Sequence, residues 1–169
     1  MIKVVITGPE SSGKTTLATA LAAYYQTPWV PEYARTYLNR IGRPYREADL
    51  LTIAQGQVQR ENKAACPSPP LLLCDTSLLV IKIWSSYRYH RCHPWIEEQL
   101  AHRPVDHYLL CRPDLPWQPD PQRENPNNRD ELFELYQQAL STISHTIIED
   151  NRAQRIESSV EVIDRLLSS

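Results

Sequence analysis

The stretch Gly8-Pro9-Glu10-Ser11-Ser12-Gly13-Lys14-Thr15 decides the fold of this chain. It has the spacing of a P-loop, in which a glycine at each end lets the backbone turn its N–H groups inward around phosphate. The lysine of such a loop reaches the β- and γ-phosphates, and the hydroxyl that follows it binds Mg²⁺. The stretch therefore predicts a site for ATP and Mg²⁺.

The residues on either side of the loop supply the structural context that this motif requires. Residues 2–7 form a β-branched run that predicts a buried strand, and residues 14–25 carry leucines at helical spacing. The amino terminus of that helix would point its positive dipole end at the phosphates. We expect the nucleotide to be bound by Gly8, Glu10, Ser11, Ser12, Gly13, Lys14, Thr15 and Thr16.

Strand and helix patterns alternate along the rest of the chain. Further strands are expected at residues 29–31, 71–75, 107–111 and 146–148. Helices are expected at residues 32–41, 46–65, 77–87, 94–102, 129–141 and 153–167. The strands are continuously apolar, which is typical of a parallel sheet covered on both faces. We expect one α/β domain over residues 1–169, with a five-stranded sheet in a three-layer P-loop NTPase fold.

Length, charge and cysteine content limit the possible classes of protein. A chain of 169 residues suits one compact domain, and a net charge of −2 does not favour binding to nucleic acid. No apolar stretch is long enough to cross a membrane, and residues 1–7 do not have the order of a signal peptide. The four cysteines form no Cys-x-x-Cys pair. We expect a cytoplasmic protein that acts on a small molecule; the sequence leaves protein partners open.

Two acidic residues follow predicted strands. Asp75 ends the strand at 71–75 and Glu32 follows the strand at 29–31. The carboxyl ends of parallel strands form the ligand cleft of such folds, so both acids should lie near the P-loop. Asp75 would serve Mg²⁺ together with Thr15, or it would cap the helix that follows. Glu32 would accept a proton from a substrate hydroxyl, or it would be a first-turn acid favoured by the helix dipole.

The segment 112–128 is long, rich in proline and flanked by arginines. It includes Arg123 and Trp117, and Arg129 follows it directly. Structureless loops of this length in a compact domain are usually functional. In phosphoryl transfer, an arginine-bearing lid neutralises charge on the transferred group and excludes water. The alternative is a solvated surface loop with ordinary ion pairs.

Several segments resemble the ribosylnicotinamide kinase domain of bacterial bifunctional NAD-biosynthesis regulators. Besides the P-loop, they are Val30-Pro31-Glu32-Tyr33-Ala34-Arg35, Asp75-Thr76, His93-Pro94-Trp95-Ile96 and Pro113-Asp114-Leu115-Pro116-Trp117. The matches occur in the order of that family and cover nearly the whole chain. The resemblance implies a nucleoside-kinase-like fold with strand order 2-3-1-4-5. It also implies transfer of phosphate from ATP to the 5′-hydroxyl of nicotinamide riboside, giving nicotinamide mononucleotide.

The resemblance assigns roles to particular residues. Lys14, Glu32, Asp75, Arg123 and Arg129 would be catalytic, with either acid able to orient or deprotonate the hydroxyl. A pocket for a cationic ring and a ribose diol needs aromatic faces and acids. The substrate would therefore contact Glu32, Tyr33, Arg35, Asp75, Trp84, Tyr87 and Trp117.

The chain also departs from the family, and other functions remain open. The Asp-Thr-Asp of the family is Asp75-Thr76-Ser77 here, and Pro121 stands where a glycine is common. One alternative is a kinase for another nucleoside or small alcohol. Another is a regulatory ATPase or nucleotide switch. A GTPase switch would need Asn-Lys-x-Asp and Asp-x-x-Gly motifs, and Asp75 is followed by Thr76-Ser77-Leu78.

Overall fold

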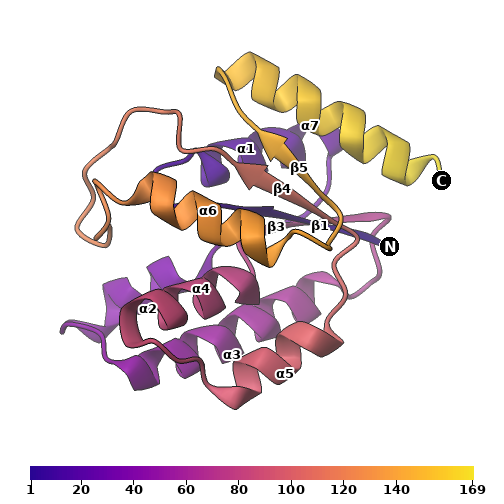
Figure 1. Cartoon of the computed structure of the whole chain (residues 1–169). Coiled ribbons are helices and arrows are strands. Elements are labelled where there is room, and N and C mark those ends of the chain that lie inside the picture. Colours follow the sequence, from indigo (N-terminus) through magenta and orange to yellow (C-terminus); the bar gives the residue numbers. More distant parts are fainter.

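A parallel five-stranded sheet forms the centre of the molecule (Figure 1). The computed structural model describes residues 1–169. Its strands are β1 (Ile2–Thr7), β2 (Trp29–Val30), β3 (Leu71–Asp75), β4 (His107–Cys111) and β5 (His145–Ile148). They lie in the order β2-β3-β1-β4-β5, and all four pairings are parallel. The expected α/β class, strand number and strand order are confirmed.

Helices cover both faces of the sheet. They are α1 (Lys14–Tyr25), α2 (Tyr33–Ile41), α3 (Glu47–Ala64), α4 (Leu78–Tyr89), α5 (Pro94–His102), α6 (Arg129–Ala139) and α7 (Arg152–Leu167). Helices α1 and α7 pack on one face. Helices α4 and α6 pack on the other, where α2, α3 and α5 join α4 in a further apolar cluster. None of these helices has the length and hydropathy needed to cross a bilayer.

Alternate residues along each strand supply the two apolar layers. Val4 and Ile6 of β1 lie in the cluster with α1 and α7, whereas Val5 lies in the cluster with α4 and α6. All three are fully buried. Burying a side chain of this kind contributes about 1.5–3 kcal/mol, so continuously apolar strands are stable only between two helical layers.

The ends of several helices differ by one or two residues from the sequence prediction, as is common where helix termini fray. Glu32 precedes α2 as its N-cap residue, because its backbone is not helical (φ −55°, ψ 119°). Ser77 caps α4: its hydroxyl accepts a hydrogen bond from the backbone N–H of Leu79 at 3.3 Å. Asp75 is therefore not the cap of that helix, and the capping alternative for it is wrong.

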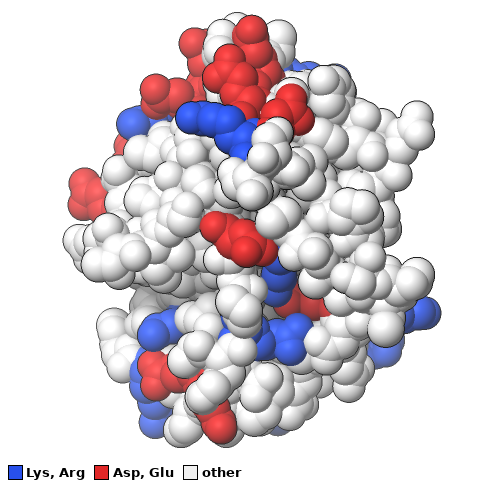
Figure 2. All heavy atoms as spheres, turned by 90° about the vertical axis from the view of Figure 1, so that its right-hand side faces the viewer, with Lys and Arg blue, Asp and Glu red and all other residues white.

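The face of the molecule in Figure 2 carries charged residues in small groups between larger uncharged areas. Acidic side chains gather at the top of this view with some basic ones beside them, and both kinds are mixed in its lower half.

Candidate active site

The P-loop joins β1 to α1 at the carboxyl edge of the sheet. Gly8 has a φ of +136°, and a Cβ at this position would lie 2.6 Å from the carbonyl oxygen of Cys111. Only glycine therefore lets the loop pass so close to β4. Gly13 has a φ of +83° and precedes the first residue of α1. The free N–H groups at the start of α1 consequently face the loop, where an anion is favoured.

The side chains of Lys14 and Thr15 hold positions that suit nucleotide binding. The ammonium of Lys14 donates hydrogen bonds to the carbonyl oxygens of Gly8 and Pro9, at 2.9 and 2.7 Å. It thus lies inside the loop curve, beside the place where phosphate oxygens would enter. The Thr15 hydroxyl donates to Oδ2 of Asp75 at 2.6 Å. The structure therefore brings together the two residues that the sequence assigned to Mg²⁺.

Asp75 has the properties of a cation ligand. Its other carboxylate oxygen, Oδ1, is buried and has no hydrogen-bond partner. Burial raises the pKa of Asp75, and the hydrogen bond from Thr15 and the charge of Lys14 oppose that shift. An unpaired buried carboxylate oxygen is costly, and a hard cation that prefers oxygen ligands would satisfy it. Thr15 and Asp75 therefore fit Mg²⁺, which would neutralise phosphate charge when bound.

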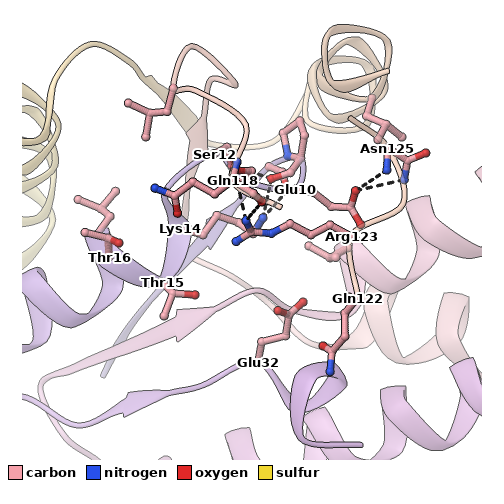
Figure 3. Close-up of a pocket in the computed structure, with 18 of the residues that line it drawn as sticks. Glu10, Ser12, Lys14, Thr15, Thr16, Glu32, Gln118, Gln122, Arg123 and Asn125 are labelled. Carbon is pink, nitrogen blue, oxygen red and sulfur yellow. Dashed lines mark hydrogen bonds between the residues drawn. The ribbon is translucent and has the colours of Figure 1, made fainter. Parts of the chain in front are cut away.

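Glu32 lies across the cavity from the P-loop. Its carboxylate points toward the space beside Lys14 and Arg123 (Figure 3). Burial raises the pKa of Glu32, the charge of Lys14 lowers it, and the charge of Asp75 raises it again. A carboxylate with a raised pKa that faces a phosphate site has the chemistry of a general base.

The cavity has a volume of about 450 Å³ and lies between the P-loop, the lid and helices α2, α4, α6 and α7. Its nucleotide end contains the P-loop together with Leu115 of the lid and Arg152 and Ile156 of α7. Its other end has a mainly apolar wall from α4 and α6, formed by Val80, Ile83, Trp84, Tyr87, Leu132 and Tyr136. A cavity with this composition suits a small molecule that has both an apolar and an ionic part.

The lid segment, residues 112–128, is held over the cavity by the P-loop. The carboxylate of Glu10 accepts hydrogen bonds from the backbone N–H groups of Glu124 and Asn125, at 3.1 and 2.9 Å (Figure 3). The Ser11 hydroxyl accepts from the N–H of Gln118 at 3.0 Å and from Arg123 at 3.4 Å. Two residues expected to bind phosphate therefore use their side chains to hold the lid.

Helix α2 holds the lid from the other side. Arg35 forms an ion pair with Asp120 at 2.8 Å. The side-chain amide of Gln122 donates to Oδ1 of Asn39 at 2.6 Å. Arg35 still lines the cavity, but its guanidinium is engaged with the lid. The lid therefore bridges the P-loop and the helix that follows Glu32.

Two of the expected aromatic contacts do not lie in the cavity wall. The ring of Tyr33 packs on Gly56 of α3, where an added Cβ would lie 2.1 Å from the ring, and the guanidinium of Arg60 stacks on it at 4.8 Å. Trp117 lies beside the guanidinium groups of Arg123 and Arg129, at 6.0 and 5.6 Å from its ring centroid. Neither ring lines the cavity in this structure, whereas Trp84 and Tyr87 do line it.

The two lid arginines are also placed differently. Arg123 lines the cavity and donates to the carbonyl oxygen of Gln118. Arg129 does not line it; its guanidinium donates to the carbonyl oxygens of Ser11 and Leu115, at 3.1 and 3.0 Å. Arg129 therefore connects the P-loop to the lid in this structure, and of these two arginines only Arg123 lines the cavity.

Sequence reasoning missed two residues of the site. Arg155 of α7 is buried and donates to the carbonyl oxygens of Ser12 and Arg112 and to the carboxylate of Asp114. Tyr136 of α6 is buried and lines the cavity. Both occur within ordinary amphipathic helix patterns, so no local signal separates them from other helical residues.

Replacing Glu32 with glutamine should stabilise the fold at neutral pH. Burial raises the folded-state pKa of this carboxyl above its ordinary value of 4.5. The folded protein therefore keeps a proton that the unfolded chain releases, and its free energy of unfolding falls as pH rises through that window. Glutamine does not titrate, so the advantage of Glu32→Gln should grow above the ordinary glutamate pKa and vanish below it.

Thermal unfolding of wild type and Glu32→Gln from pH 4 to pH 8 measures this effect. Glu98→Gln, at an exposed position of α5, is the matched control and should follow the wild type throughout. A constant difference between Glu32→Gln and wild type over the whole range would show that the carboxyl does not titrate as its burial implies.

Known proteins resemble this chain in sequence and in fold. Residues 3–157 match the family model described as AAA domain. The trifunctional NAD biosynthesis/regulator protein NadR of Escherichia coli K12 is 29% identical over 123 residues, 69% of this chain and 30% of that protein. A crystal structure of NadR in complex with NR superposes with a TM-score of 0.84 at 19% identity. That match covers 99% of this chain and 51% of the other.

A thymidylate kinase shares the architecture. Thymidylate kinase from Ehrlichia chaffeensis superposes with a TM-score of 0.67 at 17% identity, covering 98% of both chains. The P-loop kinase-like fold is thereby established, as is the resemblance to the NAD-biosynthesis regulators. This chain spans about a third to a half of the length of the NadR chains that it matches.

Proposed function

Because the chain belongs to the AAA domain family and has a P-loop kinase-like fold, we propose that it transfers phosphate from ATP to the 5′-hydroxyl of nicotinamide riboside. One observation carries the proposal. One cavity is lined by the P-loop, by Glu32 and by the aromatic side chains of Trp84 and Tyr87. The likeness to NadR in complex with NR, which we take to be nicotinamide riboside, supports this choice of acceptor.

The two ends of the cavity have different roles in the proposed reaction. Lys14 and the amides of the P-loop hold the phosphates and stabilise the charge that develops on transfer. Thr15 and Asp75 would hold Mg²⁺. Glu32 faces the acceptor end, where it orients the hydroxyl and accepts its proton. The raised pKa makes this carboxylate a stronger base than an exposed one.

Arg123 and the lid complete the arrangement. The guanidinium of Arg123 reaches the cavity between Ser11 and the lid carbonyl of Gln118. It can thus supply positive charge to the migrating phosphoryl group, as arginines do in this reaction class. The lid bridges the P-loop and α2 over the cavity, which keeps water from the reacting atoms.

Trp84 and Tyr87 are the aromatic groups proposed to contact the cationic ring. Both lie on the cavity-facing side of α4. The indole of Trp84 is fixed by a hydrogen bond from its N–H to the Tyr45 hydroxyl at 3.1 Å, and by edge-to-face contact with that ring at 4.9 Å. A fixed indole is a good cation–π partner because little conformational freedom is lost on binding.

Nicotinamide riboside should therefore be phosphorylated with a higher kcat/KM than adenosine, uridine or thymidine. A cationic ring gains about 0.5–2 kcal/mol from an aromatic face, and a neutral base lacks the ionic part of that gain. Trp84→Leu should reduce the preference by several-fold to tens-fold. ATP-dependent ADP release, measured with each nucleoside in turn, tests both statements.

Trp117→Leu is the matched control, since this indole does not line the cavity and should leave the order of preference unchanged. A wild type that prefers an ordinary nucleoside would overturn the substrate assignment and leave a kinase of another specificity. ADP release that no nucleoside stimulates would instead favour a regulatory ATPase.

A further inference from the structure

The hydroxyl of Tyr136 is a polar group that the assignments above do not use. Tyr136 lies on α6, is 4% exposed, and lines the cavity. Its hydroxyl makes no hydrogen bond within the protein. It is also not one of the fully inaccessible side-chain polar atoms that lack a partner. The phenol oxygen therefore opens into the cavity.

The ring of Tyr136 is held firmly by the core. It packs in the cluster that includes Val5 of β1, Leu79 and Ile83 of α4, and Leu132 of the preceding turn of α6. Ile83 and Leu132 also line the cavity, so the phenol group lies in an otherwise apolar wall. A buried tyrosine hydroxyl usually has a hydrogen-bond partner, and leaving it without one is costly. A ligand that enters the cavity can supply this partner.

Tyr136 lies in the same cavity as the proposed base, Glu32. Burial raises the pKa of Tyr136, and the charges of Glu32 and Glu10 raise it further. Glu32, the proposed base, lines the same cavity, and its charge acts on the phenol. Its proton stays on at neutral pH, which makes it a hydrogen-bond donor.

We propose that Tyr136 is a specificity-determining residue whose hydroxyl donates a hydrogen bond to a ribose hydroxyl of the acceptor nucleoside. This assignment rests on the proposed function and divides substrate recognition between two groups. Trp84 and Tyr87 recognise the base, whereas Tyr136 recognises the sugar near Glu32. A site that hydrogen-bonds a substrate hydroxyl discriminates strongly against analogues without it, because its own polar group is then left unpaired.

Tyr136→Phe removes only the hydroxyl and tests the proposal. We expect kcat/KM for nicotinamide riboside to fall about five- to a hundredfold, mainly through a higher KM, because the bond is present both before and during transfer. The KM for ATP should not change. Tyr108→Phe is the matched control, since Tyr108 is buried in the same cluster but does not line the cavity.

The 2′-deoxy and 3′-deoxy analogues identify the partner of the hydroxyl. With one of them, the kcat/KM of the wild type should be at least about tenfold lower than with nicotinamide riboside. The kcat/KM of Tyr136→Phe should differ little between that analogue and nicotinamide riboside. If the wild type phosphorylates both analogues as efficiently as nicotinamide riboside, the proposal is overturned, whatever the variant does. An unchanged kcat/KM in Tyr136→Phe, or an equal loss on every analogue, overturns it as well. Failure of wild type on all nucleosides would overturn the kinase proposal itself.

Discussion

Replacing Lys14 with alanine is expected to slow phosphoryl transfer by at least about a hundredfold, the scale for losing one preorganised group that stabilises transition-state charge. The ammonium lies within the curve of the P-loop, held by the carbonyl oxygens of Gly8 and Pro9. The loop contains no other lysine or arginine that could replace it. The effect should appear mainly in kcat, since the charge to be stabilised develops during transfer.

Single-turnover transfer and circular dichroism, measured on the same preparation, distinguish lost chemistry from lost structure. Lys63→Ala, at an exposed position of α3, provides the control and should retain wild-type rates. Near-normal transfer by a folded Lys14→Ala protein would show that the loop does not act as a P-loop in this chain.

Replacing Arg155 with methionine should cost about 1–3 kcal/mol in the free energy of unfolding, the range for leaving buried hydrogen-bond acceptors without their donor. The side chain of Arg155 is 4% exposed and that of Asp114 is 29% exposed. Methionine fills similar space but leaves Asp114 and the carbonyl oxygens of Ser12 and Arg112 without their donor. The P-loop and the start of the lid should loosen together, so activity should fall as well.

Urea unfolding at neutral pH measures this loss. Arg165→Met, on an exposed part of the same helix, is matched in chemistry and should change stability by less than about 0.5 kcal/mol. Equal stabilities for the two variants would mean that the Arg155 contacts contribute nothing net.

The pattern of residues along the chain was sufficient to predict the architecture and the position of the P-loop. The P-loop is formed by consecutive residues, so their identity and order are sufficient to predict it. The continuously apolar strands, each followed by a helical pattern, specified a covered parallel sheet. Glu32 and Asp75 were identified because parallel strands end at one edge, which places residues distant in sequence next to each other.

Which side chains line the cavity, and how the lid is held, could be established only from the folded chain. Tyr33 and Trp117 occur in segments that resemble ribosylnicotinamide kinase domains, yet the ring of one packs on Gly56 and the ring of the other lies beside Arg123 and Arg129. Arg155 and Tyr136 reach the site from helices that begin far along the chain. A helix pattern specifies which face is buried, whereas the neighbour met by one side chain depends on how the helices pack. That packing is a long-range property, so a buried arginine beneath the P-loop and a free phenol in the cavity become visible only once the chain is folded.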